Sequence, residues 1–148
     1  MKRVNSKLVL ALVVTLAALA VTVAAQVHRY YTPGTVWTVT TIRIKSGMDQ
    51  AYFQYLDGEF KRESEAQVSG GFMKSYKVLR TMDDDQSWNL LILREYKSMA
   101  SLEADEERSD ALSQRVAGND QTQMQGYEDR SKIREVLGTK MARELVLK

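Results

Sequence analysis

One stretch of the chain is apolar on two sides. In Trp88–Tyr96, four apolar residues follow one another, with an aromatic residue near each end and neither glycine nor proline. Side chains alternate between the two faces of a strand, so Leu90 and Ile92 point to one face while Leu91 and Leu93 point to the other. An antiparallel strand commonly leaves one face in water. This pattern therefore predicts a central strand covered by the chain's own helices on one face and by a second copy of the chain on the other.

Three further segments have the β-branched, aromatic or alternating pattern that is typical of strands. They are Val36–Lys45, Phe72–Thr81 and Met141–Lys148. Between the second and third strands, Met82–Ser87 holds three aspartates in a row and is expected to form a hairpin loop.

Helices are predicted where apolar residues recur at steps of three and four. The first is Met48–Gln67, which ends before two glycines. Glu63 follows its apolar residues at the same helical spacing. Ser98 is the predicted N-cap of the second helix. Gly118–Gln125 is polar and is expected to be a loop or a broken helix, and Tyr127–Leu137 is predicted to be a third helical piece.

The predicted order is strand, helix, strand, strand, helix, helix, strand. Right-handed crossovers and an adjacent hairpin turn this order into a split βαβ sheet with the strand order 4-1-3-2. The first and third strands then lie in the middle, which agrees with the doubly apolar third strand. Helices in this α+β arrangement cover only one face of the sheet.

The N-terminal segment has the pattern of a secretory signal. Lys2, Arg3 and Lys7 precede the uncharged stretch Leu8–Ala25, which closes on small residues. We expect residues 1–25 to be a signal peptide cleaved near Ala25, and the protein to be periplasmic or secreted. The alternative is an uncleaved membrane anchor, because the uncharged stretch reaches the lower limit of a spanning length. Residues 26–35 are then a lead-in, and residues 36–148 form one domain.

Composition excludes several classes of protein. The 148 residues are 44% hydrophobic and 27% charged, which suits one globular domain. The chain has no cysteine, so disulfides and lipid attachment at a cysteine are excluded. Three of the 21 basic residues and none of the 19 acidic ones lie in the predicted signal. The rest is close to neutral, so a nucleic-acid partner is not expected.

The element order, the doubly apolar third strand and the closing strand resemble the dimeric α/β-barrel superfamily, which has the ferredoxin-like fold. Its relatives include antibiotic-biosynthesis monooxygenases, haem-degrading monooxygenases and NIPSNAP- and EthD-like proteins. The resemblance covers about Val36–Lys148 and rests on architecture, so it implies a fold and a homodimer rather than an activity. It implies that two sheets pair their open faces, with Leu90, Leu91, Ile92 and Leu93 at the dimer face, and that the chain is an exported member of unknown function.

The sequence predicts no residues that would form a metal site, bind haem or make a catalytic triad. The single histidine, His28, precedes the predicted domain, so neither haem ligation by histidine nor a Ser-His-Asp arrangement is expected. Without cysteine, zinc and iron–sulfur sites of the ordinary type are not expected either. Consecutive aspartates seldom converge on one ion, so Asp83–Asp85 is interpreted as a solvated loop. No cofactor, metal ligand or catalytic residue is predicted.

Aromatic and arginine side chains give the one indication of a ligand site. Placed between sheet and helices, they can line a pocket in which an arginine binds an anionic group. Aromatic residues at strand and helix spacing also commonly belong to the core. The pairs Arg94-Glu95 and Arg143-Glu144 are interpreted as charge pairs within the sheet or across the dimer. The candidate ligand-binding residues are Trp37, Tyr52, Tyr76, Trp88, Arg94 and Arg143.

Three functions agree with these patterns. The first is an exported homodimeric domain that binds a small ligand between sheet and helices or serves as a scaffold. The second is a cofactor-independent, oxygenase-like enzyme of the dimeric α/β-barrel class, favoured by an apolar cavity with Trp88 or Tyr52 and an arginine in its wall. The third is a membrane-anchored envelope interaction protein, favoured by an uncleaved N-terminus.

Overall fold

The computed structural model describes residues 29–82 and 87–148. The predicted signal (residues 1–25), His28 and the Asp83–Asp85 stretch lie outside the described residues. The described residues divide into two units, residues 29–32 with Leu147 and Lys148, and Pro33–Val146. The second unit holds the fold described below.

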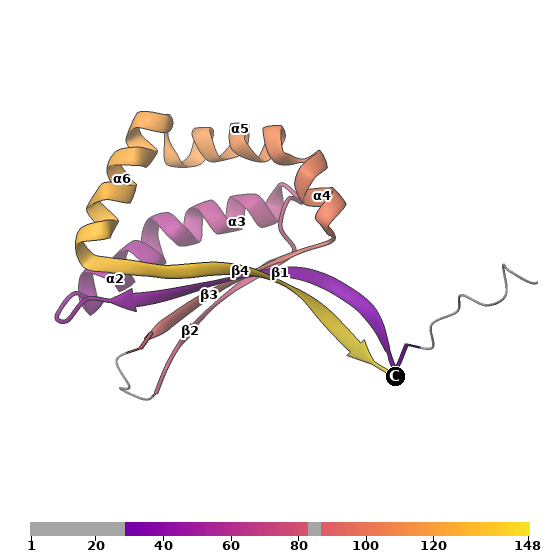
Figure 1. Ribbon diagram of the computed structural model, residues 1–148. Helices are drawn as coiled ribbons and strands as arrows, with labels where there is room; N and C mark the ends of the chain where they lie inside the picture. Colours follow the sequence, from indigo (N-terminus) through magenta and orange to yellow (C-terminus); the bar gives the residue numbers. More distant parts are fainter. Residues whose placement is uncertain (1–28, 83–86) are drawn as a thin grey trace, which may run out of the picture. The chain divides into compact units, whose positions relative to one another are not determined.

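A four-stranded sheet with the order β2-β3-β1-β4 forms the base of this unit (Figure 1). Its central strands β1 and β3 are antiparallel, and so are β2 and β3. Strands β1 and β4 are antiparallel too. Lys45 at the end of β1 bonds Ile133 just before β4, whereas Thr35 near the start of β1 bonds Glu144 near the end of β4. The predicted order 4-1-3-2 is confirmed. The strands are β1 (Tyr31–Ile44), β2 (Ser75–Arg80), β3 (Leu90–Tyr96) and β4 (Arg134–Leu147).

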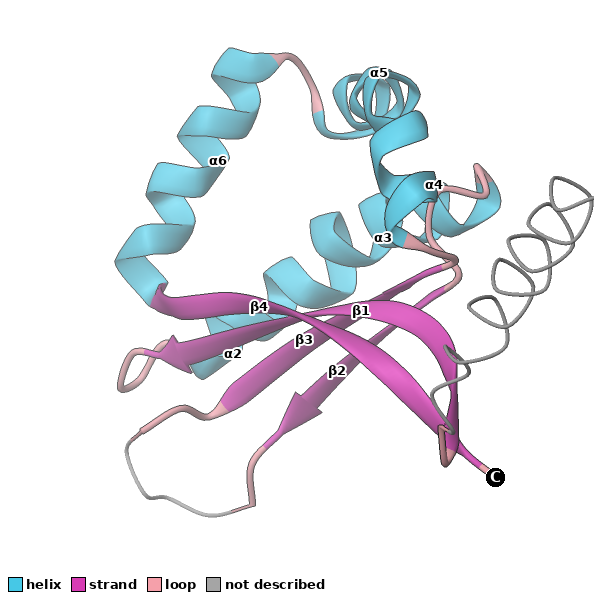
Figure 2. Cartoon of the chain, turned by 45° about the vertical axis from the view of Figure 1, so that its right-hand side comes forward, coloured by secondary structure: helices cyan, strands magenta, loops and turns pink. Residues whose placement is uncertain are grey.

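The described helices all lie on one side of the sheet (Figures 1 and 2). A first helical segment joins β1 to β2, and a second group joins β3 to β4, which gives the order β-α-β-β-α-α-β of the ferredoxin-like fold. The first segment comprises α2 (Asp49–Tyr55), the π-helical turn η1 (Leu56–Phe60) and α3 (Lys61–Ser69), and the second comprises α4 (Met99–Ala104), α5 (Glu106–Ala117) and α6 (Asp120–Ile133). None of these helices is long and apolar enough to cross a membrane.

The core lies between the sheet and the first helical segment. Its buried members come from β1, α2, η1 and β3, namely Ile42, Ile44, Tyr52, Phe60, Leu90 and Ile92. On β3, Leu90 is 1% exposed and Ile92 is 5% exposed. The prediction that all four apolar residues of this strand form a dimer face is therefore corrected, because Leu90 and Ile92 are already covered by their own helices. Only Leu91 and Leu93 remain on the other face.

That second face has no cover within the described part of the chain. Strand register places Val39 opposite Leu93, and Leu79 opposite Leu91. Leu79 is 48% exposed, and Leu91 and Leu93 are partly exposed. We call the apolar surface formed by Trp37, Val39, Leu79, Leu91 and Leu93 the open face.

The predicted first helix is confirmed, with one irregular turn. In η1 the hydrogen bonds span five residues instead of four, so this turn takes up one more residue than a regular one. Phe60 thereby returns to the face of Tyr52, and both side chains are buried. The Ser98 cap is also confirmed, since Ser98 and Ser101 each bond the other's backbone N–H at 3.1 Å.

The region before the last strand differs from the sequence-based expectation. Residues from Asp120 are helical although Gly118–Gln125 was expected to be a loop or a broken helix. The Asn119 side chain caps this helix by accepting a hydrogen bond from the Thr122 N–H at 3.0 Å. The helix ends at Ile133, so the predicted helical piece Tyr127–Leu137 is confirmed up to Ile133 and wrong for Arg134–Leu137, which begin β4.

Strands β1 and β4 are both longer than predicted. β4 begins at Arg134 instead of Met141, and β1 begins at Tyr31, inside the predicted lead-in. The two strands are neighbours in the sheet. Each offers hydrogen-bond partners to the backbone N–H and C=O groups of the other, which explains why both are longer than predicted. Pro33 is tolerated since β3 pairs with β1 only from Val36 onward, so the missing N–H costs no bond to β3.

Candidate functional site

Three of the predicted ligand-binding residues lie on the helix-covered side of the sheet, around Phe60. Tyr76 on β2 meets the Phe60 ring edge-on, with centroids 5.6 Å apart. The guanidinium of Arg94 on β3 lies 5.3 Å from the centre of the same ring. Tyr52 stacks on Tyr55 at 5.6 Å, and Tyr55 is 6.4 Å from Phe60. This aromatic layer joins the sheet to α2 and η1.

The other three predicted residues lie elsewhere. Trp37 is on the open face, where the ammonium group of Lys77 lies 5.8 Å from its ring centre. Trp88 precedes β3 and lines an open, mainly polar cavity of about 810 Å³ together with Arg43 and Arg80. Arg143 is exposed on β4. These side chains do not join the layer around Phe60.

A smaller cavity of about 230 Å³ lies next to this layer. It is bounded by α3, β3, α4 and α5, and the loop before β2 adds Met73. Its polar lining residues are Glu63, Ser64, Gln67, Arg94, Ser109 and Ser113.

One wall of the cavity is a fixed hydrogen-bond network between α3 and α5. The Gln67 amide donates to the Ser113 hydroxyl at 2.9 Å and to the Ser109 carbonyl at 3.3 Å. The Ser109 hydroxyl donates to the Gln67 side-chain carbonyl at 3.1 Å. Both amide groups of Gln67 are thus engaged, whereas the Ser113 hydroxyl hydrogen takes part in no described contact. Because the Ser113 oxygen accepts from Gln67, the hydroxyl hydrogen of Ser113 can serve a ligand in the cavity.

The cavity also presents a cation, Arg94 on β3, and an acid, Glu63 on α3 one turn before Gln67. Within the described residues, no acceptor lies at hydrogen-bond or ion-pair distance from the Arg94 guanidinium. Burial raises the pKa of Glu63, and the positive charge of Arg94 only partly offsets this effect. The cavity therefore offers donors from Arg94 and Ser113, and a carboxyl group that holds its proton more tightly than usual.

The two glutamates of the predicted charge pairs, Glu95 and Glu144, bond other residues than the neighbouring arginines. Glu95 bonds Lys74 at 2.8 Å and the Ser75 hydroxyl at 2.6 Å, and these two hydrogen bonds lower its pKa to about 2. Glu144 accepts from the Thr35 hydroxyl at 3.1 Å. Adjacent residues of a strand point to opposite faces, so Arg94 and Glu95 cannot pair with each other within the sheet.

A second set of cations lies over the tyrosines. The guanidinium of Arg130 is 4.8 Å from the Tyr55 ring centre and forms an ion pair with Glu59 at 2.9 Å. The guanidinium of Arg134 is 5.6 Å from the Tyr52 ring centre. Tyr52 is fully buried, its hydroxyl has no hydrogen-bond partner among the described residues, and burial raises its pKa to about 12. These contacts attach α6 and β4 to the first helical segment.

Of the residues predicted from the sequence, Arg94 lines this cavity, whereas Tyr52 and Tyr76 belong to the neighbouring aromatic layer, and the network between α3 and α5 was not predicted. The sequence pattern placed Glu63 at the end of the apolar stripe of the first helix, but it did not predict which residues surround Glu63. Gln67 and Ser113 lie on separate helices, and no local pattern predicts that they meet. Within residues 29–82 and 87–148, no three acidic, histidine or cysteine side chains gather in a possible metal site.

Comparison with known proteins identifies the fold alone. No protein-family model matches the sequence. No curated protein matches it either. A dimeric ferredoxin-like protein from an uncultured marine organism has a similar structure, with a TM-score of 0.50, 14% identity, and coverage of 79% of this chain and 98% of that one. This likeness agrees with the ferredoxin-like topology seen in the sheet.

Two other solved structures are similar at lower scores. HapK from Hahella chejuensis has a TM-score of 0.49 and 12% identity, with coverage of 74% of this chain and 92% of that one. A NIPSNAP family protein with unknown function from Agrobacterium tumefaciens has a TM-score of 0.47 and 14% identity, with coverage of 82% of this chain and 93% of that one.

Proposed function

We propose that this protein is a homodimeric domain that binds a small anionic molecule between the sheet and the helices of each protomer. The observation that carries this proposal is the Arg94 guanidinium, which lines a cavity without an acceptor from the described chain. A planar guanidinium with five N–H donors is well suited to a carboxylate or phosphate. A partly buried guanidinium without a hydrogen bond is uncommon in a purely structural position.

The lining specifies the chemistry of the ligand. Arg94 and Ser113 offer donors to an anionic or carbonyl oxygen, and Glu63 can bond a hydroxyl or amine of the same molecule. The volume of about 230 Å³ is smaller than the 300–1,000 Å³ of pockets for drug-sized molecules. A compact hydroxy- or amino-carboxylate therefore fits these groups better than an extended lipid or a nucleotide.

The homodimer is proposed from the open face. Trp37, Val39, Leu79, Leu91 and Leu93 supply its apolar surface, and the strand register sets Lys77 opposite Leu93 and Glu95 opposite Trp37. An apolar patch with few charged groups is typical of homodimer interfaces. Antiparallel sheets that pair in this way bury the same patch on both protomers, as a two-fold interface requires. The similar protein from the uncultured marine organism is described as dimeric, which supports the same arrangement here.

Binding is tested on the purified protein with a panel of small carboxylates. We expect a panel member to raise the melting temperature of the wild type, and Arg94→Gln to abolish the increase. Arg108→Gln is the matched control, because Arg108 also lies over an aromatic ring, Phe72 at 5.2 Å, but does not line the cavity. An equal response in wild type and Arg94→Gln, or no response to any carboxylate, would contradict the proposal.

An oxygenase-like enzyme is the second candidate, and the raised pKa of Glu63 favours it. A carboxyl group next to a bound anion can take a proton from the ligand when it is ionised. The cavity that holds Trp88 is mainly polar, and the one that holds Arg94 lacks both Trp88 and Tyr52. The apolar cavity that would favour an oxygenase is thus not among the cavities described. Oxygen consumption with a bound carboxylate, lost in Glu63→Gln, would favour this candidate over a binding domain.

Export is proposed from the sequence of residues 1–25 alone. A mature protein that begins near Gln26 would support cleavage and a periplasmic or secreted location. A mass that includes Met1 would instead favour the membrane-anchored interaction protein.

A further inference from the structure

A second cavity, separate from the one at Arg94, lies where α6 passes into β4. Its volume is about 360 Å³, and it is lined by Lys45, Tyr127, Ser131, Arg134, Glu135 and Val136. The cavity is partly open to solvent, and all of these residues belong to the unit Pro33–Val146.

Arg134 lines this cavity and has no polar partner within residues 29–82 and 87–148. One face of its guanidinium lies over the buried Tyr52 ring at 5.6 Å. No acceptor among the described residues is within hydrogen-bond distance, and its Nε is completely buried. The contact with Tyr52 fixes the position of the guanidinium, and because Nε is buried, the terminal N–H groups are the donors that a ligand in the cavity would use.

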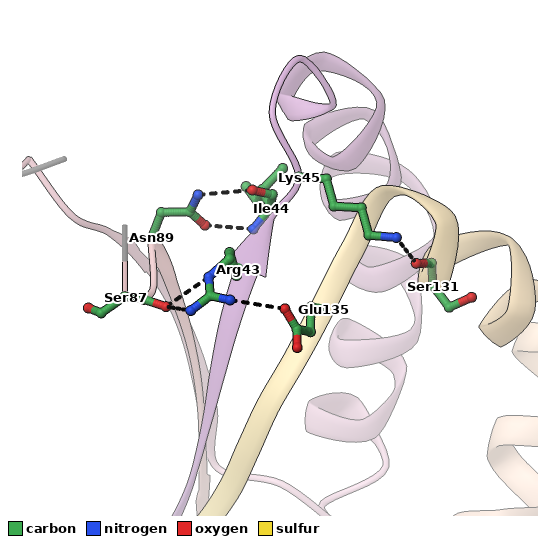
Figure 3. Close-up of polar contacts among 7 residues, drawn as sticks. All are labelled: Arg43, Ile44, Lys45, Ser87, Asn89, Ser131 and Glu135. Carbon is green, nitrogen blue, oxygen red and sulfur yellow. Dashed lines mark hydrogen bonds and ion pairs between the residues drawn. The ribbon is translucent and has the colours of Figure 1, made fainter. Parts of the chain in front are cut away.

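Lys45 supplies a second cation beside Arg134. Its ammonium group donates to the Ser131 carbonyl at 2.8 Å (Figure 3). Its backbone N–H donates to the Ile133 carbonyl at 3.0 Å. These bonds satisfy carbonyls at the carboxyl end of α6, where a cation is favourable. An ammonium has three donors, so this contact fixes the position of Lys45 and leaves donors for a ligand.

The one acidic residue in the lining is held by another partner. Glu135 forms an ion pair with Arg43 at 3.1 Å, and Arg43 is itself fixed by two bonds to the Ser87 carbonyl, at 2.6 and 3.0 Å. Figure 3 shows the Glu135 carboxylate turned toward Arg43 and away from Lys45. The charges of Lys45 and Arg134 therefore remain without a counter-ion in the cavity.

Apolar side chains sit beside these two cations. Tyr127 is 59% exposed and Val136 is 39% exposed, and both line the cavity. We propose that this cavity is a second binding site, for a carboxylate with an apolar or aromatic body, in which Arg134 and Lys45 hold the carboxylate and Tyr127 and Val136 contact the body. A bare inorganic anion would use only the cations and leave the apolar wall in water.

Benzoate titrated into the ¹⁵N-labelled full chain at low salt tests this site, with inorganic phosphate as the second probe. We expect benzoate to shift the amide signals of residues 127–136 and of Lys45 in a saturable manner. Phosphate should bind the same residues more weakly. Phosphate binding that equals or exceeds that of benzoate, or benzoate shifts confined to other residues, would overturn the assignment.

Three variants separate the site from general charge effects. Arg134→Gln should weaken benzoate binding by about tenfold or more, the value of a charge-assisted pair. Val136→Glu, which leaves Arg134 in place and changes an exposed side chain, should weaken it similarly by repulsion. Arg143→Gln removes an arginine from the exposed part of the same strand and should leave the affinity unchanged. Equal effects of Arg134→Gln and Arg143→Gln, or an unchanged affinity in Val136→Glu, would contradict the proposal.

Discussion

Leu91 and Ile92 are neighbours on β3 and lie on opposite faces of the sheet. Ile92 is 5% exposed in the core below the helices, while Leu91 lies on the open face opposite Leu79 of β2. The same chemical change therefore has different consequences at two consecutive positions.

We expect Leu91→Glu to yield a folded monomer and Ile92→Glu to yield an unfolded chain. An unpaired charge at the buried position costs several kcal/mol, which is a large part of the stability of a domain of this size. At Leu91 the charge meets water in the free protomer and is buried only in the proposed dimer. Light scattering gives the mass, and circular dichroism gives the helix content. A wild type that is monomeric at every concentration would contradict the dimer.

The arginines over Phe60 and Tyr55 are expected to differ in their contribution to stability. Arg130→Gln removes a partly buried ion pair with Glu59 at 2.9 Å as well as a ring contact, and should cost about 1–3 kcal/mol. Arg94→Gln loses only the contact with Phe60, and should cost about 0.5–1 kcal/mol. Urea denaturation measures both free energies of unfolding. An Arg94 variant as unstable as the Arg130 variant would identify Arg94 as a structural residue.

Acid should destabilise the protein partly through Glu95. Its hydrogen bonds with Lys74 and Ser75 lower its pKa from 4.5 to about 2. The stability that Glu95 contributes is therefore complete above pH 4.5 and is lost as the pH falls toward 2. Its side chain is 15% exposed, so we expect Glu95→Gln to cost about 1–2 kcal/mol at pH 7 and little at pH 2. Glu65→Gln, on the exposed side of α3, is the control for the loss of one carboxylate. A cost that does not change with pH would argue against this role of Glu95.

Tyr52 should titrate at unusually high pH. Burial raises its pKa from 10.0 to about 12, so its contribution to stability is lost as the pH rises from 10 through 12. Absorbance of the tyrosinate should show a component near pH 12 that disappears in Tyr52→Phe and persists in Tyr127→Phe. Because the Tyr52 hydroxyl has no described partner, Tyr52→Phe should change the stability at pH 7 by less than about 1 kcal/mol. A larger loss would show that the hydroxyl is bonded in the folded protein.

Local patterns were sufficient for most of the elements. The alternation in β3, the stripe from Tyr52 to Phe60 and the Ser98 cap are all interactions between residues close in sequence, and each is present in the structure. Their order, with right-handed crossovers, was enough to give the sheet topology. The errors lie at Asp120–Gln125, which is helical, and at Arg134–Lys140, where β4 begins early because it pairs with β1.

Local patterns were enough to predict a ferredoxin-like sheet whose central strand is apolar on both faces, because strand alternation is a property of neighbouring residues. The packing of the helices settled which face is covered: Leu90 and Ile92 lie under the helices, and Leu91 and Leu93 do not. It also decided that Gln67 and Ser113 meet beside Arg94, and that Lys45 and Arg134 share a cavity. Such contacts join residues far apart in the chain, and their geometry is set by how helices pack on the sheet, which no local pattern encodes.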